Sequence, residues 1–105
     1  MTTPKVAVKM GADGVPVAVC SGDFDMDTTS LLVEACYEAT PGQPLVVDVT
    51  QVTFADSSFL NALVRLRKDC PLTLQGPLPD QFRRLLEMTG ALGLFAIRRP
   101  TDPAR

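Results

Sequence analysis

Three adjacent polar residues, Asp56, Ser57 and Ser58, stand between an apolar segment and an amphipathic one. Asp and Ser are favoured at the N-terminus of a helix, because their side-chain oxygens accept hydrogen bonds from backbone N–H groups that the helix leaves unpaired. A serine there is also suited to phosphorylation, since the unpaired N–H groups and the positive end of the helix dipole stabilise a phosphate. The triplet is therefore interpreted either as a plain helix cap or as a phosphorylation site that changes the surface without unfolding the domain.

A second group of acidic residues consists of Asp23, Asp25 and Asp27, and Glu34 follows Asp23 by eleven positions. This spacing is similar to positions one, three, five and twelve of a calcium-binding loop. Thr28 stands, however, where such a loop needs glycine, and a predicted strand precedes the segment instead of a helix. We expect an acidic loop in which Asp27 or Thr28 caps the following helix, and no metal site.

The chain contains no histidine, so an enzyme would have to work with carboxylates, Lys or Tyr. Ser–His and Cys–His nucleophilic catalysis are excluded, and the commonest metal ligand is absent. Cys20, Cys36 and Cys70 are widely spaced and form no CxxC pair, so we expect small buried hydrophobes, with neither a disulfide framework nor a zinc site. Residues 11–14 lack the lysine of a nucleotide-binding loop and are predicted to form a hairpin turn. We expect no enzyme activity and no cofactor.

The 105 residues fit one compact domain, residues 1–105, and the 46% of hydrophobic residues suffices for a core. The net charge of −2 and the pI near 4.9 argue against a nucleic-acid-binding surface, which would normally be basic. No apolar run reaches the length of a membrane span, and the N-terminal residues lack the features of a signal peptide. We therefore expect a cytoplasmic protein with no nucleic-acid partner.

Hydrophobic periodicity predicts alternating strands and helices. The predicted strands are residues 5–10, 15–20, 45–49, 72–74 and 94–97, followed by a loose tail from about Arg98. The first predicted helix begins at Asp27 or Thr28 and ends at residues 40–42. The second begins after Asp56 and ends at Cys70. The third has Pro79 at its first helical position and ends at Gly90. Residues 21–27 and 50–55 are predicted connections. The order β-β-α-β-α-β-α-β predicts an α/β domain with a mixed, mainly parallel sheet of four to five strands and helices packed against it.

Apolar residues at helical spacing predict the buried face of each helix. In the first helix they are Leu31, Leu32, Ala35, Cys36 and Ala39. In the second they are Phe59, Leu60, Leu63, Val64 and Leu66, with Arg67 beside them, whereas Asn61, Arg65 and Lys68 point to water. In the third they are Phe82, Leu85, Leu86 and Met88. Residues 45–49 are nearly all apolar, which predicts a central strand that is covered on both faces.

Three stretches of the chain resemble the STAS domain found in bacterial anti-sigma factor antagonists. Residues 21–25, Ser-Gly-Asp-Phe-Asp, resemble the loop after the family's second strand. Residues 46–60 resemble its most typical segment, a strand followed by an aromatic residue and Asp-Ser-Ser/Thr-Gly-Leu. Residues 78–91 resemble its last long helix, with a proline-led start, Arg-Leu-Leu, and a glycine before the final strand. The order and spacing agree over nearly the whole domain, so the resemblance implies a STAS-like single-domain fold.

The resemblance also implies a binding protein whose partner is an anti-sigma factor that is a serine kinase. In that family the unphosphorylated antagonist binds the anti-sigma factor, and phosphorylation of the first hydroxyl residue after the motif aspartate ends the complex. Ser57 would then be the phosphorylated residue, with Ser58 as the second choice. The implied partner-binding residues are Asp23, Asp25, Asp56, Ser57, Ser58, Phe59 and Asn61.

One residue departs from the family pattern, since Phe59 stands where the family has glycine. A benzyl group there could keep a partner's backbone at a distance, or it could supply a new apolar contact. The departure favours an alternative function, that of a STAS accessory subunit of a larger assembly, such as a transporter or a signalling complex, with no phosphate switch.

Overall fold

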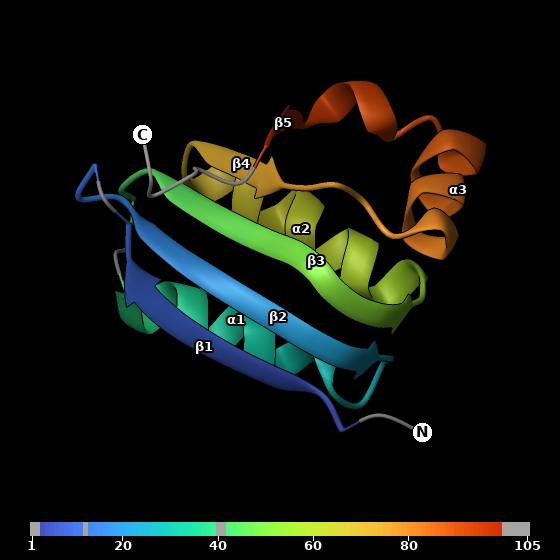
Figure 1. Ribbon diagram of the computed structural model, residues 1–105, viewed down its shortest axis with the longest axis horizontal. Coiled ribbons are helices and arrows are strands. Elements are labelled where there is room, and N and C mark those ends of the chain that lie inside the picture. The colour runs from blue at the N-terminus through green and yellow to red at the C-terminus, as the bar shows by residue number, and fades with distance from the viewer. Residues whose placement is uncertain (1–2, 12, 40–41, 100–105) are drawn as a thin grey trace.

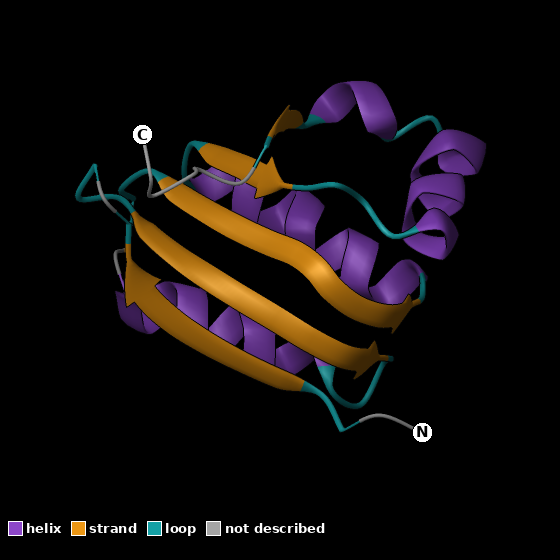
Figure 2. Ribbon diagram, viewed as in Figure 1, coloured by secondary structure: helices purple, strands orange, loops and turns teal. Residues whose placement is uncertain are grey.

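The computed structural model describes residues 3–11, 13–39 and 42–99 of the chain (Figure 1). Its strands are β1 (Lys5–Met10), β2 (Pro16–Phe24), β3 (Leu45–Ala55), β4 (Leu72–Gln75) and β5 (Ala96–Arg98). Its helices are α1 (Thr29–Ala39), α2 (Ser57–Asp69) and α3 (Asp80–Thr89), and a short 3-10 turn, η1 (Leu92–Leu94), follows α3. The predicted order of strands and helices is confirmed (Figure 2).

The strands form one sheet of five in the order β1-β2-β3-β4-β5. β1 and β2 form an antiparallel hairpin, and every other neighbouring pair is parallel. Figure 1 shows α1 and α2 on the same face of this sheet, with α3 beside it near the end of β3. The predicted α/β fold class with a mixed, mainly parallel sheet is confirmed. A helix connects the two strands of each parallel pair, because parallel neighbours need a crossover connection, which is usually a helix. None of the described helices has the length and apolar character needed to cross a membrane.

β2 and β3 are longer than predicted, because both continue into residues that the sequence assigns to connections. Residues 21–24 belong to β2, and residues 50–55 belong to β3. The two extensions pair with each other, and register shifts interrupt the pairing on both sides of residues 21–22. Gly22 has a φ of 89° there, and a Cβ at this position would collide with the backbone of Thr3. The polar residues and the glycine of these extensions do not show the hydrophobic pattern of a strand, so the sequence does not predict them. They adopt strand structure because each extension pairs with the other.

Smaller differences concern the ends of elements. β5 begins two residues later than predicted and includes Arg98, which the sequence assigns to a tail. Pro79 precedes α3 instead of occupying its first helical position. Gly90 ends α3 in the left-handed conformation, with a φ of 74°, as predicted. The predicted burial of Ala39, the predicted helix end at Thr40 and Pro41, and the remaining tail, residues 100–105, lie outside what the structure describes.

Three phenylalanines occupy the centre of the core. The ring centroid of Phe59 in α2 lies 4.9 Å from that of Phe24 in β2 and 5.6 Å from that of Phe82 in α3. All three side chains are fully buried. Aromatic pairs at such distances stabilise a core beyond the apolar area that they bury. The cluster therefore joins the sheet, α2 and α3 at the end of the sheet where β2 finishes.

Most of the predicted buried helix positions lie in the core, among them Leu32, Cys36, Leu60, Leu63, Leu66 and Leu86. The predicted burial of Leu31 and Met88 is wrong, since their side chains are 41% and 86% exposed, and Arg67, predicted on the inward face of α2, is exposed as well. Successive helical residues are about 100° apart around the axis. Leu31 is one position from the buried Leu32 and Met88 is two positions from the buried Leu86, so both turn away from the face that packs.

All five residues from Leu45 to Val49 are buried, as predicted for a central strand. Asp48 is the polar member, and both of its carboxylate oxygens are bonded. Its Oδ1 accepts from the Thr50 backbone N–H at 2.9 Å and the Thr50 hydroxyl at 2.7 Å, and its Oδ2 accepts from Gln75 Nε2 at 2.9 Å. These hydrogen bonds offset the cost of burying a carboxylate in the sheet.

The three cysteines are free thiols. Cys20 and Cys36 are buried, and burial raises the pKa of both, to about 12 for Cys36. Burial also raises the pKa of the half-buried Cys70 thiol. The thiols therefore stay protonated at neutral pH and pack as small apolar side chains, as the sequence predicts.

Phe59→Ala is expected to lower the free energy of unfolding by about 3–5 kcal/mol, because it removes a fully buried ring from the centre of the aromatic cluster. A urea titration followed by circular dichroism measures this loss. Phe54→Ala is the matched control, since the Phe54 side chain is 44% exposed, and it should cost far less. A Phe59→Ala variant as stable as the control would contradict the described packing.

Candidate functional site

The carboxyl ends of β2 and β3 bring two of the predicted site segments together. Phe24, the last residue of β2, is paired with Ala55, the last residue of β3. The backbone N–H of Asp56 donates to the carbonyl oxygen of Phe24 at 3.3 Å. The turn that starts at Asp25 therefore lies directly beside the start of α2. The carboxyl edge of parallel strands is also where α/β proteins usually build their sites.

Asp56 is the N-cap of α2. Its Oδ1 accepts hydrogen bonds from the backbone N–H of Ser58 at 2.9 Å and from that of Phe59 at 3.3 Å. Its backbone is extended, with a φ of −103° and a ψ of −173°, as is usual at this position. The interpretation of the triplet as a helix cap is confirmed for Asp56. The cap also occupies two of the N–H groups that a phosphate at this helix end would otherwise use.

The two serines of the triplet differ in their surroundings. Ser57 is the first residue of α2 and is exposed. Its hydroxyl makes no hydrogen bond with any residue that the structure describes. Ser58 is half-buried and faces a groove between α1 and α2. Of the two hydroxyls, that of Ser57 is the more accessible to another protein.

Asp25 forms the turn between β2 and α1. Its Oδ1 accepts from the backbone N–H of Asp27 at 3.0 Å, the backbone N–H of Thr28 at 3.1 Å and the Thr28 hydroxyl at 3.0 Å. The Thr28 hydroxyl also accepts from the Asp25 N–H at 2.9 Å. The prediction that Asp27 or Thr28 caps α1 is wrong, because the side chain of Thr28 bonds back to Asp25 in a local turn. The Asp25 carboxylate is thereby held at the edge of the site.

Asp23 lies within β2 and is half-buried. The hydroxyl of Thr53 in β3 donates to its carboxylate, which ties the extended ends of the two strands together. The calcium-loop spacing does not produce a loop, because Asp23 is part of a strand and Glu34 is exposed on α1. Among the residues that the structure describes, no group of three acidic, cysteine or histidine side chains could hold a metal ion.

A groove of about 400 Å³ lies between α1 and α2 next to this site. Ser58, the exposed Asn61 and Arg65 line it from α2, and Met26 lines it from the turn before α1. Met26 is 77% exposed and is absent from the site residues that the sequence predicts. The available signal was its place between two aspartates in a predicted loop, where an apolar side chain has little chance of burial.

Phe59 does not belong to this surface, although the family resemblance implies that it binds the partner; its burial is the one that the helical periodicity predicts. Its side chain is fully buried against Phe24 and Phe82. It therefore neither keeps a partner at a distance nor offers it an apolar contact. The predicted site residues that gather at the edge are Asp25, Asp56, Ser57, Ser58 and Asn61, with Asp23 half-buried at the end of β2.

A family model and two solved structures are similar to this chain. The family model, described as "Mlab, STAS domain", matches residues 10–96. The crystal structure of an anti-sigma factor antagonist from Mycobacterium paratuberculosis has a TM-score of 0.70 and 28% identity, over 94% of this chain and 87% of that one. The anti-sigma factor antagonist SpoIIAA in its unphosphorylated form has a TM-score of 0.70 and 15% identity, over 95% of this chain and 91% of that one, which is a likeness of fold alone. No curated protein matches the chain significantly.

Asp56→Ala should lower the free energy of unfolding by about 0.5–2 kcal/mol, because it removes the acceptor for two N–H groups at the start of α2. The same urea titration measures this change. Asp56→Asn is the matched control, because asparagine caps helices about as well as aspartate does. Equal destabilisation by both substitutions would mean that the charge of Asp56, and not its hydrogen bonds, stabilises the helix.

Proposed function

The chain belongs to the STAS domain family, and from this premise we propose that it is an anti-sigma factor antagonist. Its partner is an anti-sigma factor with serine kinase activity, and the protein acts by binding, in the cytoplasm, and not as an enzyme. The similarity to an anti-sigma factor antagonist at 28% identity supports this proposal. The observation that carries it is the exposed Ser57 hydroxyl, which makes no hydrogen bond with the described residues and lies at the start of α2, beside the turn that Asp25 forms.

The proposed partner-binding surface combines polar and apolar side chains. It comprises Asp23, Asp25, Asp56, Ser57, Ser58 and Asn61, with Met26 added. The carboxylates of Asp25 and Asp56 each accept hydrogen bonds from backbone N–H groups of this chain, so neither of them needs a basic side chain of the partner opposite Ser57. Met26 supplies a flexible apolar contact that adapts to the partner's shape.

The hydrogen bonds of the cap decide where a phosphate on Ser57 lies. Asp56 already accepts from the N–H groups of Ser58 and Phe59, so the phosphate can bond to these groups only by displacing the cap. It adds about −1.5 to −2 charges next to an existing carboxylate and therefore projects into solvent. Burying such a charge against a partner without a positive side chain to pair it costs on the order of several kcal/mol. Phosphorylation therefore releases the partner and leaves the fold intact.

Incubation with the cognate kinase and ATP is expected to add one phosphate to the protein, at Ser57, because this hydroxyl is exposed and free of hydrogen bonds to the described residues. Intact-mass spectrometry and peptide mapping measure the modification. Ser57→Ala should abolish it, whereas the matched control Ser58→Ala should retain it. Phosphate mapped to Ser58, or no incorporation with the kinase that binds the protein, would count against the proposal.

Ser57→Asp should weaken binding to the anti-sigma factor by about tenfold or more, because it adds a carboxylate beside that of Asp56 at the proposed interface. Isothermal titration calorimetry measures the dissociation constant. Ser57→Asn is the matched control, since it has nearly the same shape without the charge, and it should bind close to the wild-type affinity. If the two variants bind equally well, the electrostatic mechanism is wrong.

A second candidate function is an accessory subunit of a larger assembly, such as a transporter or a signalling complex. The match to a STAS domain model agrees with both functions. Purification of the tagged protein with its bound partner separates the two functions. A kinase-like anti-sigma factor supports the first function and an ATPase subunit supports the second, in which case Ser57→Asp should leave the assembly intact.

A further inference from the structure

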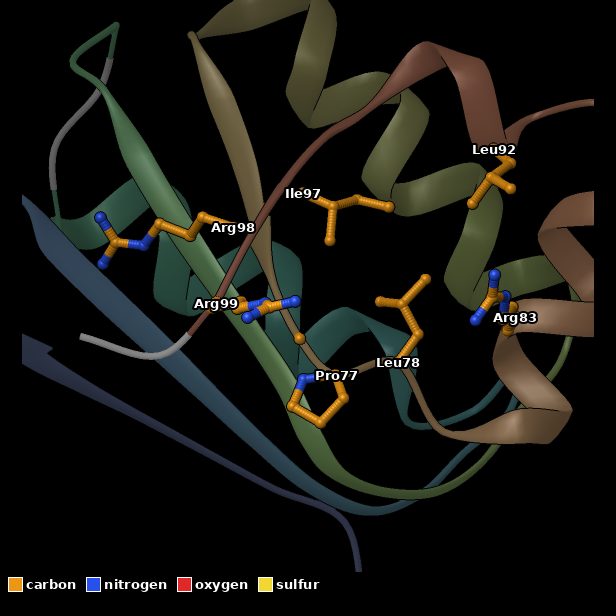
Figure 3. Close-up of a pocket in the computed structure, with 8 residues that line it drawn as sticks. Pro77, Leu78, Arg83, Leu92, Ile97, Arg98 and Arg99 are labelled. Atoms are coloured by element: carbon orange, nitrogen blue, oxygen red, sulfur yellow. The ribbon is translucent and has the colours of Figure 1, made fainter. Parts of the chain in front are cut away.

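A cavity of about 730 Å³ lies between the connection from β4 to α3 and the segment from η1 to β5 (Figure 3). This volume lies within the range of small-molecule sites, roughly 300–1,000 Å³. The residues that line it include none of the site residues predicted around Ser57. The cavity is therefore a separate feature of the molecule.

The walls of the cavity are largely apolar. Figure 3 shows Leu78, Leu92 and Ile97 turned toward the same space from three different segments. Leu78 and Leu92 pack against the hydrophobic core, whereas Ile97 is 44% exposed. Apolar side chains that converge in this way favour a ligand with an apolar body, because its binding removes apolar area from water.

Arginines supply the charge of the cavity. Arg83, Arg98 and Arg99 line it, and no acidic side chain is among its lining residues in the part of the chain that the structure describes. This local excess of positive charge contrasts with the net charge of −2 of the whole chain. A guanidinium group binds a carboxylate or a phosphate through two parallel hydrogen bonds. The charge of the cavity therefore favours an anion.

Arg98 has a structural role. Its Nε donates to Gln75 Oε1 at 3.1 Å, and one of its terminal nitrogens lies 3.7 Å from Asp13 Oδ2. In Figure 3 its guanidinium is turned away from the leucines and the isoleucine. These contacts tie β5 to β4 and to the hairpin turn, so Arg98 is not available to a ligand.

Arg83 and Arg99 remain available for an anion. Arg83 has an exposed ion pair with Glu87 at 4.0 Å, and such pairs contribute little and exchange readily for a better partner. Arg99 is the last residue that the structure describes, and it makes no hydrogen bond or ion pair with the other described residues. The two side chains reach the cavity from α3 and from the residue after β5.

We propose that this cavity binds a small amphipathic anion, a molecule with a carboxylate or phosphate group on an apolar body. Arg83 and Arg99 bind the anionic group, and Leu78, Leu92 and Ile97 pack against the apolar body. The proposal is independent of the function proposed for Ser57, because the cavity and the groove beside Ser58 share no residue.

Nuclear magnetic resonance of the ¹⁵N-labelled protein tests this proposal, with octyl phosphate and octanoate as probes below their micelle-forming concentrations. At least one of them should give saturable shifts of the backbone amide signals of Gly76, Leu78, Leu92 and Ile97, while the signal of Ser57 stays unchanged. The comparison of the two identifies the preferred anionic group. Octanol has the apolar body without the charge, and inorganic phosphate has the charge without the body. Both controls should bind about tenfold more weakly or worse.

Arg83→Gln and Arg99→Gln should each weaken binding of the preferred probe by about tenfold, because each removes one charged hydrogen-bond donor. Arg84→Gln is the matched control and should leave the affinity unchanged, since Arg84 is also exposed on α3 but does not line the cavity. The spectra of the variants check that each of them folds. The proposal is overturned if neither anion shifts the cavity signals, if octanol or inorganic phosphate binds equally well, or if the double variant Arg83→Gln/Arg99→Gln retains wild-type affinity.

Discussion

The pairing between the end of β2 and the end of β3 is the constraint on which the rest of the structure depends. It sets Phe24 opposite Ala55, and this register places the Asp25 turn beside the Asp56 cap. β4 pairs only with the first four residues of β3, so the far end of β3 needs another partner on that side. Gln81 of α3 provides it, since its side-chain amide accepts from the Ala55 N–H at 2.9 Å and donates to the Ala55 carbonyl oxygen at 2.7 Å. The site therefore stands on a strand end that is hydrogen-bonded on both sides.

The aromatic cluster beneath this edge connects the site to the core. Phe59 is two residues after Ser57 in the first turn of α2, and its ring packs between Phe24 and Phe82. A large residue fits at position 59 because these two rings enclose it. The departure from the family glycine therefore changes the interior of the domain and leaves the surface around Ser57 unobstructed. One helical turn supplies both a buried anchor and an exposed hydroxyl.

The fold separates two surfaces of opposite charge. The edge at Ser57 presents the carboxylates of Asp25 and Asp56, whereas the cavity beside β5 presents Arg83 and Arg99. The small net charge of −2 gives no indication of this separation. The positive charge of the cavity attracts an anionic small molecule, whereas a negative charge added at the Ser57 edge is repelled by the carboxylates already there.

The sequence by itself determined the order of strands and helices, most of the buried helix faces and the role of Asp56 as a cap, because these depend on periodicity and hydrogen bonds within a few residues. Only the tertiary structure decided the length of β2 and β3, whose polar ends become strands by pairing with each other. It also decided which rings enclose Phe59, whose burial the helical periodicity predicts, and it placed Arg83 and Arg99 around one cavity. These features depend on contacts between residues far apart in the chain, and such contacts leave no local pattern in the sequence.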